Sequence, residues 1–561
     1  MRTKKSINTI KLFFFITLFS VCISSEINGQ VVWENYRNEV YDYLSRMAQK
    51  GVINFDDVIK PLTRIYIAKS LQEVSLHSNE LSQIEKKELQ FYLQEYANDT
   101  DTTQTSSPVS ILKKDKAGRW RAFNIQSKDF SLNADPIFQG SGNRYSGNNY
   151  IHQSIGANLY GRIGKHIGFQ LSSNDITENR DARGKDSITF KDAQTGYVLL
   201  SDTGNHRSLN YNELKASIGY SWKNGTISIG QDYLLWGYGE NGRIVLSDKA
   251  PAYPYIRLDY QPFTWLKFQY MHAWLNSDIV DSPRTYGLGN TVYGGQRIIY
   301  VPKYMATHTL TFKPNKKTDI SIGESIIYSD QMNIGYLIPI MFFKIYDNLT
   351  SNNSVLAGSN GQFFFQVSSR NWLKNTHLYS TLFVDEIRVA KIFSRSENRN
   401  QLGFNLGASV TDVFIPDLTL NAEYTRVNPF VYNNINPSQT YTNHGFNLGD
   451  WVGNNFDRII LSAKYTPVAK LKCYISYQYI RKGGPGTLDQ QYSQGLTTPS
   501  YVTPFLFDYQ YSQQEIFINF SYQWIHNLYL NAYVRSVREN NKINLTTTST
   551  LSSGIGFSYG L

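Results

Sequence analysis

Apolar and polar residues alternate with a period of two from Trp120 onward. In the clearest example, one alternating run ends at Trp222, the dipeptide Asn224-Gly225 follows, and a second alternating run begins with Ile227 and Ile229. Asn-Gly between two alternating runs is a strong signal for a β-hairpin. The same layout predicts tight turns near 164–166, 261–264, 314–316, 371–375, 416–417, 466–470 and 524–527. The pattern therefore predicts many strands, each with one apolar and one polar face.

The predicted turns alternate with longer connections. About eight tight turns and about nine longer connections give about 18 strands, the layout of an outer-membrane barrel. The longer connections are expected at 127–150, 175–209, 234–253, 276–303, 330–360, 389–399, 428–455, 482–512 and 540–548. A soluble sandwich or propeller does not explain why the long connections alternate with the short ones.

The chain ends on the alternating stretch SSGIGFSYGL. A closed barrel has no free edge, so its last strand must pair with its first. We expect that partner near Trp120–Gln126.

Residues 30–100 carry a different, helical pattern, and we expect them to form a periplasmic region. Val40, Leu44 and Met47 recur at helical spacing, and Thr63 is a candidate N-cap for a second helix. Ser82-x-x-Glu85 matches a capping box ahead of a third. Residues 101–118 are polar and are predicted to be a linker, followed by the barrel over 119–561.

Residues 1–29 match a signal peptide. A basic start precedes the apolar run Leu12–Ile23, which is shorter than a membrane helix, and cleavage is expected near Gly29-Gln30. Cys22 suggests a lipoprotein, but the residues before it are not the small ones that such a site requires. The sequence thus predicts an exported protein of the outer membrane in a Gram-negative-type envelope. After cleavage Cys473 is the only cysteine, which excludes an intrachain disulfide.

The composition agrees with an outer-membrane barrel and argues against nucleic-acid binding. The chain has 41 Tyr and 31 Phe but only 6 Met, and its mean hydropathy is −0.38. The net charge of +10 includes the basic residues of the signal peptide and is too diffuse to indicate nucleic-acid binding.

No catalytic motif is visible in the sequence. Ser-His-Asp spacing, His-Glu-x-x-His and phosphate-binding glycine loops do not occur. Asp385 and Glu386 are adjacent and are expected on opposite faces of a strand unless a bulge intervenes, which makes a poor acid/base pair. We therefore expect a protein that is not an enzyme and has no cofactor and no metal site.

Three segments resemble the Wzi family of capsule-assembly outer-membrane proteins. Residues 227–258 resemble it through Trp236-Gly237-Tyr238-Gly239 and Ala250-Pro251. Two further matching segments are 307–343 and 377–387, through His308, Glu324, Tyr328, Pro339, Phe342, Tyr379, Asp385 and Glu386. The resemblance implies an 18-stranded barrel with periplasmic helices and a lectin-like role toward capsular or exopolysaccharide. Separately, residues 40–71 loosely resemble an S-layer-homology module, for which a small helical cap is the alternative.

Aromatic and amide side chains in the long connections are candidate sugar contacts. The glycan-binding candidates are Trp236, Tyr238, Asn241, Arg243, Tyr293 and Tyr432. Two alternatives remain open: Trp236 as an anchor at the membrane rim, and ordinary loop chemistry for the others.

Three polar residues are candidates for a network in the barrel lumen, namely His308, Glu324 and Asp385. By parity Glu324 shares a face with Ile320 and Ile322, and a carboxylate that faces lipid is costly. Either this face points inward, where Glu324 could pair with His308, or a bulge shifts the register.

The function predicted from the sequence is surface attachment of capsular or exopolysaccharide. The alternatives are a channel for solutes or polysaccharide, and an envelope scaffold for a secretion or gliding-motility complex. Expected partners are the polysaccharide, outer-membrane lipid, and peptidoglycan or a periplasmic partner through the N-terminal helices.

Overall fold

The computed structural model describes residues 31–100, 107–115, 118–180, 208–289, 294–350, 358–386, 401–493 and 502–560. The predicted signal peptide lies outside them. No helix among these residues is long and apolar enough to cross a membrane.

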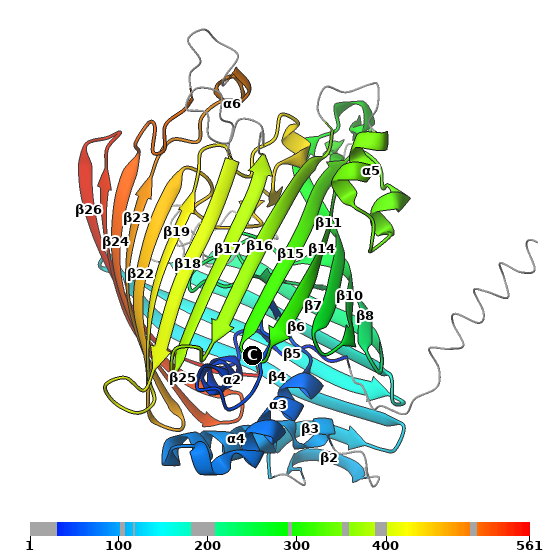
Figure 1. Cartoon of the computed structure of the whole chain (residues 1–561), viewed down its shortest axis with the longest axis vertical. Coiled ribbons are helices and arrows are strands. Elements are labelled where there is room, and N and C mark those ends of the chain that lie inside the picture. Colours follow the sequence, from blue (N-terminus) through cyan, green and yellow to red (C-terminus); the bar gives the residue numbers. More distant parts are fainter. Residues whose placement is uncertain are drawn as a thin grey trace, which may run out of the picture.

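Eighteen strands pair in chain order and close an antiparallel barrel (Figure 1). Alternation with a period of two places one apolar face outward along each strand. The strands are β4 (Phe130–Tyr145), β5 (Asn148–Ile163), β6 (Ile167–Arg180), β7 (Ser208–Trp222), β8 (Gly225–Asp232), β10 (Tyr253–Phe263), β11 (Leu266–Val280), β14 (Tyr300–Asn315), β15 (Thr318–Ser329), β16 (Asn360–Arg370), β17 (Thr376–Glu386), β18 (Gln401–Thr411), β19 (Leu418–Val427), β22 (Phe456–Val468), β23 (Leu471–Lys482), β24 (Tyr511–Ile525), β25 (Leu528–Asn541) and β26 (Thr546–Tyr559).

All eight predicted tight turns join neighbouring strands at one end of the barrel, which we call the short-turn end. The connections at the opposite, long-loop end hold small elements. These are β9 (Leu235–Trp236), η2 (Ser282–Arg284), β12 (Tyr286–Gly287), β13 (Gln296–Arg297), η3 (Ile334–Leu337), α5 (Phe343–Thr350), η5 (Pro437–Gln439), β20 (Thr442–Asn443), β21 (Phe446–Asn447) and α6 (Leu488–Ser493).

The closing strand is β4, which corrects the prediction that residues 120–126 close the barrel. Ser552 to Tyr559 pair with Tyr145 to Phe138. Residues 127–150, predicted to be a long connection, therefore hold all of β4, a tight turn and the start of β5. Their many glycines and asparagines indicated a loop. The pairing of β26 with β4, which we call the seam, nevertheless requires small residues, because a Cβ on Gly556 would lie 2.7 Å from the Gly140 carbonyl oxygen.

Strands β2 (Ser107–Lys114) and β3 (Trp120–Gln126) extend the sheet at the short-turn end. β3 pairs with β2 and with residues 131–134 of β4, next to the end of β26. The stretch predicted to be a linker, 101–118, therefore contains a strand. Val109 and Ile111 give this strand a period-two pattern, and both are exposed because the β2–β3 hairpin lies outside the closed barrel.

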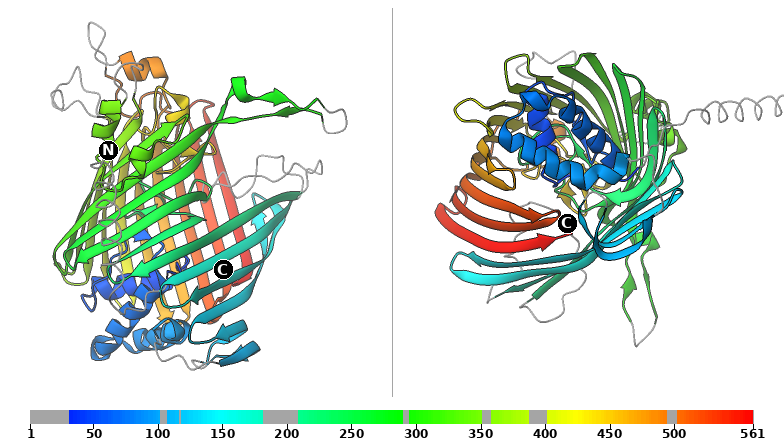
Figure 2. Two further views of the ribbon diagram at one scale, coloured as in Figure 1. Left: turned by 90° about the vertical axis from the view of Figure 1, so that its right-hand side faces the viewer. Right: turned by 90° about the horizontal axis from the view of Figure 1, so that it is seen from below.

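Three helices lie across the short-turn end: α2 (Val40–Gln49), α3 (Arg64–Leu76) and α4 (Gln83–Thr100), with η1 (Ser78–Glu80) between the last two (Figure 2). Thr63 caps α3 by accepting from the Tyr66 amide. Ser82 and Glu85 form the reciprocal capping box of α4, at 3.1 and 2.7 Å. The helices share an apolar core that includes Leu44, Leu71 and Leu89.

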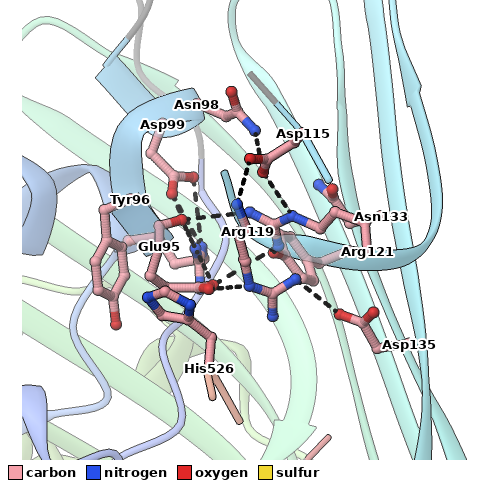
Figure 3. A network of polar contacts seen from close by, with 12 residues as sticks. Glu95, Tyr96, Asn98, Asp99, Asp115, Arg119, Arg121, Asn133, Asp135 and His526 are labelled. Carbon is pink, nitrogen blue, oxygen red and sulfur yellow. Dashed lines mark hydrogen bonds and ion pairs between the residues drawn. The ribbon is translucent and has the colours of Figure 1, made fainter. Parts of the chain in front are cut away.

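The helical region is fixed to the barrel by buried charges. The Glu95 carboxylate of α4 contacts Arg64 at 3.0 Å and also Arg119 and Arg121, which flank the start of β3 (Figure 3). Arg119 reaches Asp135 of β4 at 3.3 Å. Burial raises the pKa of Glu95, but the three guanidinium groups outweigh it and hold that pKa well below its usual range.

The barrel interior is partly filled from both ends. Strand β1 (Ile59–Lys60) of the N-terminal region pairs with β9, which lies in the β8–β10 connection. The β19–β22 connection, 428–455, packs on the same core through Tyr432, Tyr441 and Leu448.

Candidate ligand-binding cavity in the barrel

A cavity of about 900 Å3 lies inside the barrel. One wall is formed by α2 and the residues before it, another by the β8–β10 connection, and a third by the inward faces of β4, β5 and β22–β26. This volume is in the range of small-molecule binding sites.

A row of aromatic rings crosses the strand wall of the cavity. Tyr474 on β23 lies 6.0 Å from Phe517 on β24, and Phe517 lies 6.2 Å from Tyr533 on β25, measured between ring centroids. The Tyr150 hydroxyl on β5 is 3.5 Å from that of Tyr533. All four residues line the cavity. We call Tyr150, Tyr474, Phe517 and Tyr533 the aromatic row.

Amide and charged groups flank the aromatic row. The Tyr533 hydroxyl donates to the side-chain Oδ1 of Asn143 at 3.1 Å, Arg535 pairs with Glu515 at 2.7 Å, and His152 approaches Glu178 at 2.9 Å. Aromatic faces next to planar polar groups can bind a ligand that has both C–H faces and many hydroxyl groups.

The opposite wall is also polar. Lys464 of β22 contacts Asp42 of α2 at 3.2 Å and Glu240 at 3.4 Å. Glu39, at the N-cap of α2, accepts from the Ser521 hydroxyl at 2.7 Å. Burial raises the pKa of Glu39 to about 7, although the nearby Lys472 ammonium and the Ser521 hydrogen bond act in the opposite direction.

Three ion pairs hold the N-terminal region beneath the cavity. Asp57 accepts from Arg370 at 2.5 Å, and Asp56 accepts from Lys267 and Lys313 at 3.0 and 2.9 Å. Burial opposes the charged forms, but these cations outweigh it and hold the pKa of each carboxyl below its usual range. Both carboxylates are therefore charged at neutral pH.

Three of the predicted glycan contacts line this cavity rather than an outer loop. They are Tyr238, Asn241 and Arg243. Asn241 donates to Gln478 at 2.9 Å, and Arg243 donates to the Gly237 carbonyl oxygen at 2.7 Å. The Tyr238 ring lies 5.5 Å from that of Tyr379.

Two other glycan candidates are buried, which corrects the prediction for them. Trp236 is 2% exposed and packs edge-on against Phe364, so no face is open to a sugar or to lipid. Tyr432 is also 2% exposed, and it donates to the Ile244 carbonyl oxygen at 2.7 Å. Both side chains hold the inward-folded connections together. Tyr293 lies outside the described residues.

The three residues predicted to form a lumen network do not lie on the same face of the barrel wall. Asp385 lies at a bulge in β17 and faces inward, where it accepts from Gln362 at 3.2 Å and from the Tyr432 amide at 2.6 Å. His308 and Glu324 are cross-strand partners, 3.7 Å apart, but they lie on the outer face of the barrel. The prediction of an inward position for them is wrong, because the chain covers this part of the outer wall with a later segment.

The aromatic row was missed by sequence reasoning. Its members lie inside strands rather than in loops, and a tyrosine in a strand alternation looks the same whether it faces lipid or the lumen. Register across the seam, which brings Tyr150 next to Tyr533, is not visible in the sequence.

Comparison with known proteins places this architecture in a family. The model of the capsule assembly protein Wzi family matches residues 129–536. No curated protein matches the chain. The solved structure of Wzi from Escherichia coli, described as an outer-membrane protein involved in group 1 capsule assembly and as a carbohydrate-binding β-barrel, aligns with a TM-score of 0.55 at 12% identity. It covers 94% of this chain and 98% of that one.

Two further solved structures align less closely. OprD of Pseudomonas aeruginosa has a TM-score of 0.43 at 9% identity, and OccAB2 of Acinetobacter baumannii has 0.42 at 11%. Each covers 76% of this chain, with 94% and 97% of its own length aligned. The family match extends over most of the chain and the fold agrees with that of the Escherichia coli protein, so this chain belongs to the Wzi family of capsule assembly proteins.

Proposed function

We propose that this outer-membrane barrel binds capsular polysaccharide or exopolysaccharide and attaches it at the cell surface, as a binding protein rather than an enzyme. The observation that carries the proposal is the aromatic row, which lies inside a barrel of the Wzi family and is flanked by amide and charged groups. Such a surface suits a polyhydroxylated chain, because sugar C–H faces pack on the rings while hydroxyl groups meet the polar neighbours.

The filled interior supports binding rather than transport. The N-terminal region and the connections 233–252 and 428–455 share one apolar core inside the barrel. A polymer that crossed the barrel would have to displace this core. We further propose that the short-turn end, with helices α2 to α4, faces the periplasm, and that the long-loop end faces outward. In porin-type barrels the short turns lie on the periplasmic side.

Substitution in the aromatic row tests the proposal. Truncating a central contact of a binding site typically costs about 1–2 kcal/mol, which is about 5- to 30-fold in affinity. We expect Phe517→Ala to weaken binding of oligosaccharides released from the cell's own capsule by about that factor, measured by calorimetry on the purified barrel.

Phe520→Ala is the matched control. Phe520 lies on the same strand but is 47% exposed on the outer face, so this variant should bind with unchanged affinity. Equal affinities for wild type and Phe517→Ala would remove the aromatic row from the proposal. No binding by the wild-type barrel would contradict the proposed function itself.

A further inference from the structure

The outer wall of the barrel carries a group of polar side chains where lipid is expected. Tyr270, His308 and Glu324 are register partners on β11, β14 and β15. Ile322 on the same face of β15 is 54% exposed, whereas the neighbouring Ser321 is buried on the lumen side. A carboxylate on this face costs free energy unless something shields it.

Residues 330–350, which we call the strap, provide that shield. The strap leaves the long-loop end of β15, turns through η3 and folds back along the outer wall as α5, beside the upper ends of β14 and β15 (Figure 1). Glu324 accepts from the Phe343 and Lys344 amides at 2.9 and 2.6 Å. The carboxylate thus satisfies the N-terminus of α5, where unpaired N–H groups and the helix dipole favour an anion.

Further contacts fix the strap to the wall. His308 Nδ1 is 3.0 Å from the Pro339 carbonyl oxygen, and Tyr270 donates to the Tyr336 carbonyl oxygen at 2.8 Å. Phe343 is fully buried and Tyr336 is 2% exposed, both in one cluster with Tyr328 of the wall. The inner side of the strap is therefore a packed part of the protein.

The outer side of the strap is apolar and uncovered. Phe342, Ile345 and Leu349 have the spacing of one helix face and are 66%, 59% and 69% exposed. The residues that precede α5 add to this surface, namely Ile334, Ile338 and Ile340. An apolar surface of this kind marks a site of contact with a membrane or with another protein.

The adjoining wall indicates which of these covers the strap. Phe363 and Phe365, on the outer face of the neighbouring strand β16, are 45% and 41% exposed. Phe363 is the register partner of Glu324 itself, so the strap surface continues directly into the apolar belt that faces lipid. Lipid is therefore expected to cover the exposed surface of the strap, because it already covers the adjoining wall.

We propose that the strap is a lipid-binding surface, which inserts Phe342, Ile345 and Leu349 among the acyl chains of the outer leaflet. The choice of leaflet rests on the proposed orientation, but insertion into lipid does not. The strap thereby converts a polar part of the wall into an apolar one. It anchors the barrel through apolar residues of α5 and its N-terminal flank, in addition to the strands themselves.

Spin labels can test this in the full chain. Replacing Cys473, the only cysteine outside the predicted signal peptide, by serine gives a background for Ile345→Cys and Leu349→Cys, each labelled with a nitroxide in vesicles of outer-membrane lipid. Collision rates with oxygen, which concentrates in lipid, and with a water-soluble nickel complex are then measured.

Two positions calibrate the result. Ile322→Cys reports the lipid-facing wall, and Leu545→Cys, 86% exposed in the β25–β26 turn, reports water. We expect both strap labels to match Ile322, with high oxygen and low nickel collision rates. Nickel collision rates like those of Leu545 would overturn the proposal. Low rates with both reagents would overturn it in favour of a second copy or another protein as the occupant.

Discussion

At the scale of single residues, environment decides roles that residue type leaves open. Trp236 and Tyr238 stand two positions apart in a motif that suggested sugar contacts, yet the first is sealed in the core and the second lines the cavity. Glu324 and Asp385 were both assigned to the lumen, but only Asp385 lies there. The sequence could show that these residues are unusual in a strand; it could not show what would cover them.

Glu39 should give the docking of α2 a pH dependence. Its pKa in the folded state is raised to about 7, above the value near 4.5 of an exposed glutamate. The folded state thus disfavours its charged form, so stability is highest below about pH 4.5 and is lost as pH rises toward 7.

Glu39→Gln should therefore be more stable than wild type at pH 8, by of the order of 1 kcal/mol, and equal to it at pH 4. Urea unfolding of the two proteins at both pH values measures this. Gln keeps an acceptor for Ser521, so the comparison isolates the charge. A difference that is the same at both pH values would contradict the buried-carboxylate interpretation.

Glu324 should hold the start of α5 in place. Removing its carboxylate in Glu324→Ala leaves two amides without their acceptor and costs about 1–2 kcal/mol locally. We expect faster hydrogen exchange over residues 335–350 and unchanged exchange in β14 and β15. Glu324→Gln keeps one acceptor oxygen, so its hydrogen exchange over residues 335–350 should be intermediate between wild type and Glu324→Ala. Unchanged exchange in α5 would show that apolar packing alone holds the strap.

At the scale of elements, local signals predicted most strands and helices. Asn-Gly, Pro-Asp and similar turns located all eight short connections, and Thr63 and Ser82 located two helix starts. The wrong predictions concern segments whose composition is typical of loops but whose backbone pairs as a strand. Residues 138–145 are rich in Gly and Asn and were assigned to a loop, but they form the strand against which β26 closes.

The strap is the other element that sequence reasoning placed only as a connection. Its apolar stretch Ile338–Phe343 carries the signal, since six residues, five of them apolar, are unusual in an exposed loop. What the stretch packs against depends on polar groups of strands far away in the chain, His308 among them.

The seam between β26 and β4 should be sensitive to side-chain size. A Cβ at Gly556 would lie 2.5 Å from the Ser141 Cβ and 2.7 Å from the Gly140 carbonyl oxygen, so Gly556→Ala should reduce the fraction of closed barrel. Gly142→Ala, on the partner strand, meets nothing within 4 Å and serves as the control. Heat-modifiable migration on gels measures closure. Equal closure of both variants would contradict the register described for the seam.

At the scale of the whole molecule, the barrel is an assembly of three interlocked parts. The N-terminal region enters from the short-turn end, the two long connections enter from the other, and the strands surround both. The sequence predicted the barrel and the helices because alternation and capping are local. It did not predict the filled interior or the cavity, because these depend on contacts such as Arg370 with Asp57, more than 300 positions away.

Because the interior is filled, the proposed binding function and the channel alternative predict different ion conductance. A barrel closed in this way should show little ion conductance in planar bilayers. Stable, large conductance steps from the wild-type protein would favour the channel.

The partition of polysaccharide between cells and medium tests the central claim most directly. A strain that lacks the protein is compared with the same strain carrying wild type, Phe517→Ala or Phe520→Ala, at equal total polysaccharide and equal barrel level. The account predicts that polymer is released to the medium without the protein, is retained with wild type and Phe520→Ala, and is partly released with Phe517→Ala. Equal attachment in the presence and absence of the protein would contradict it.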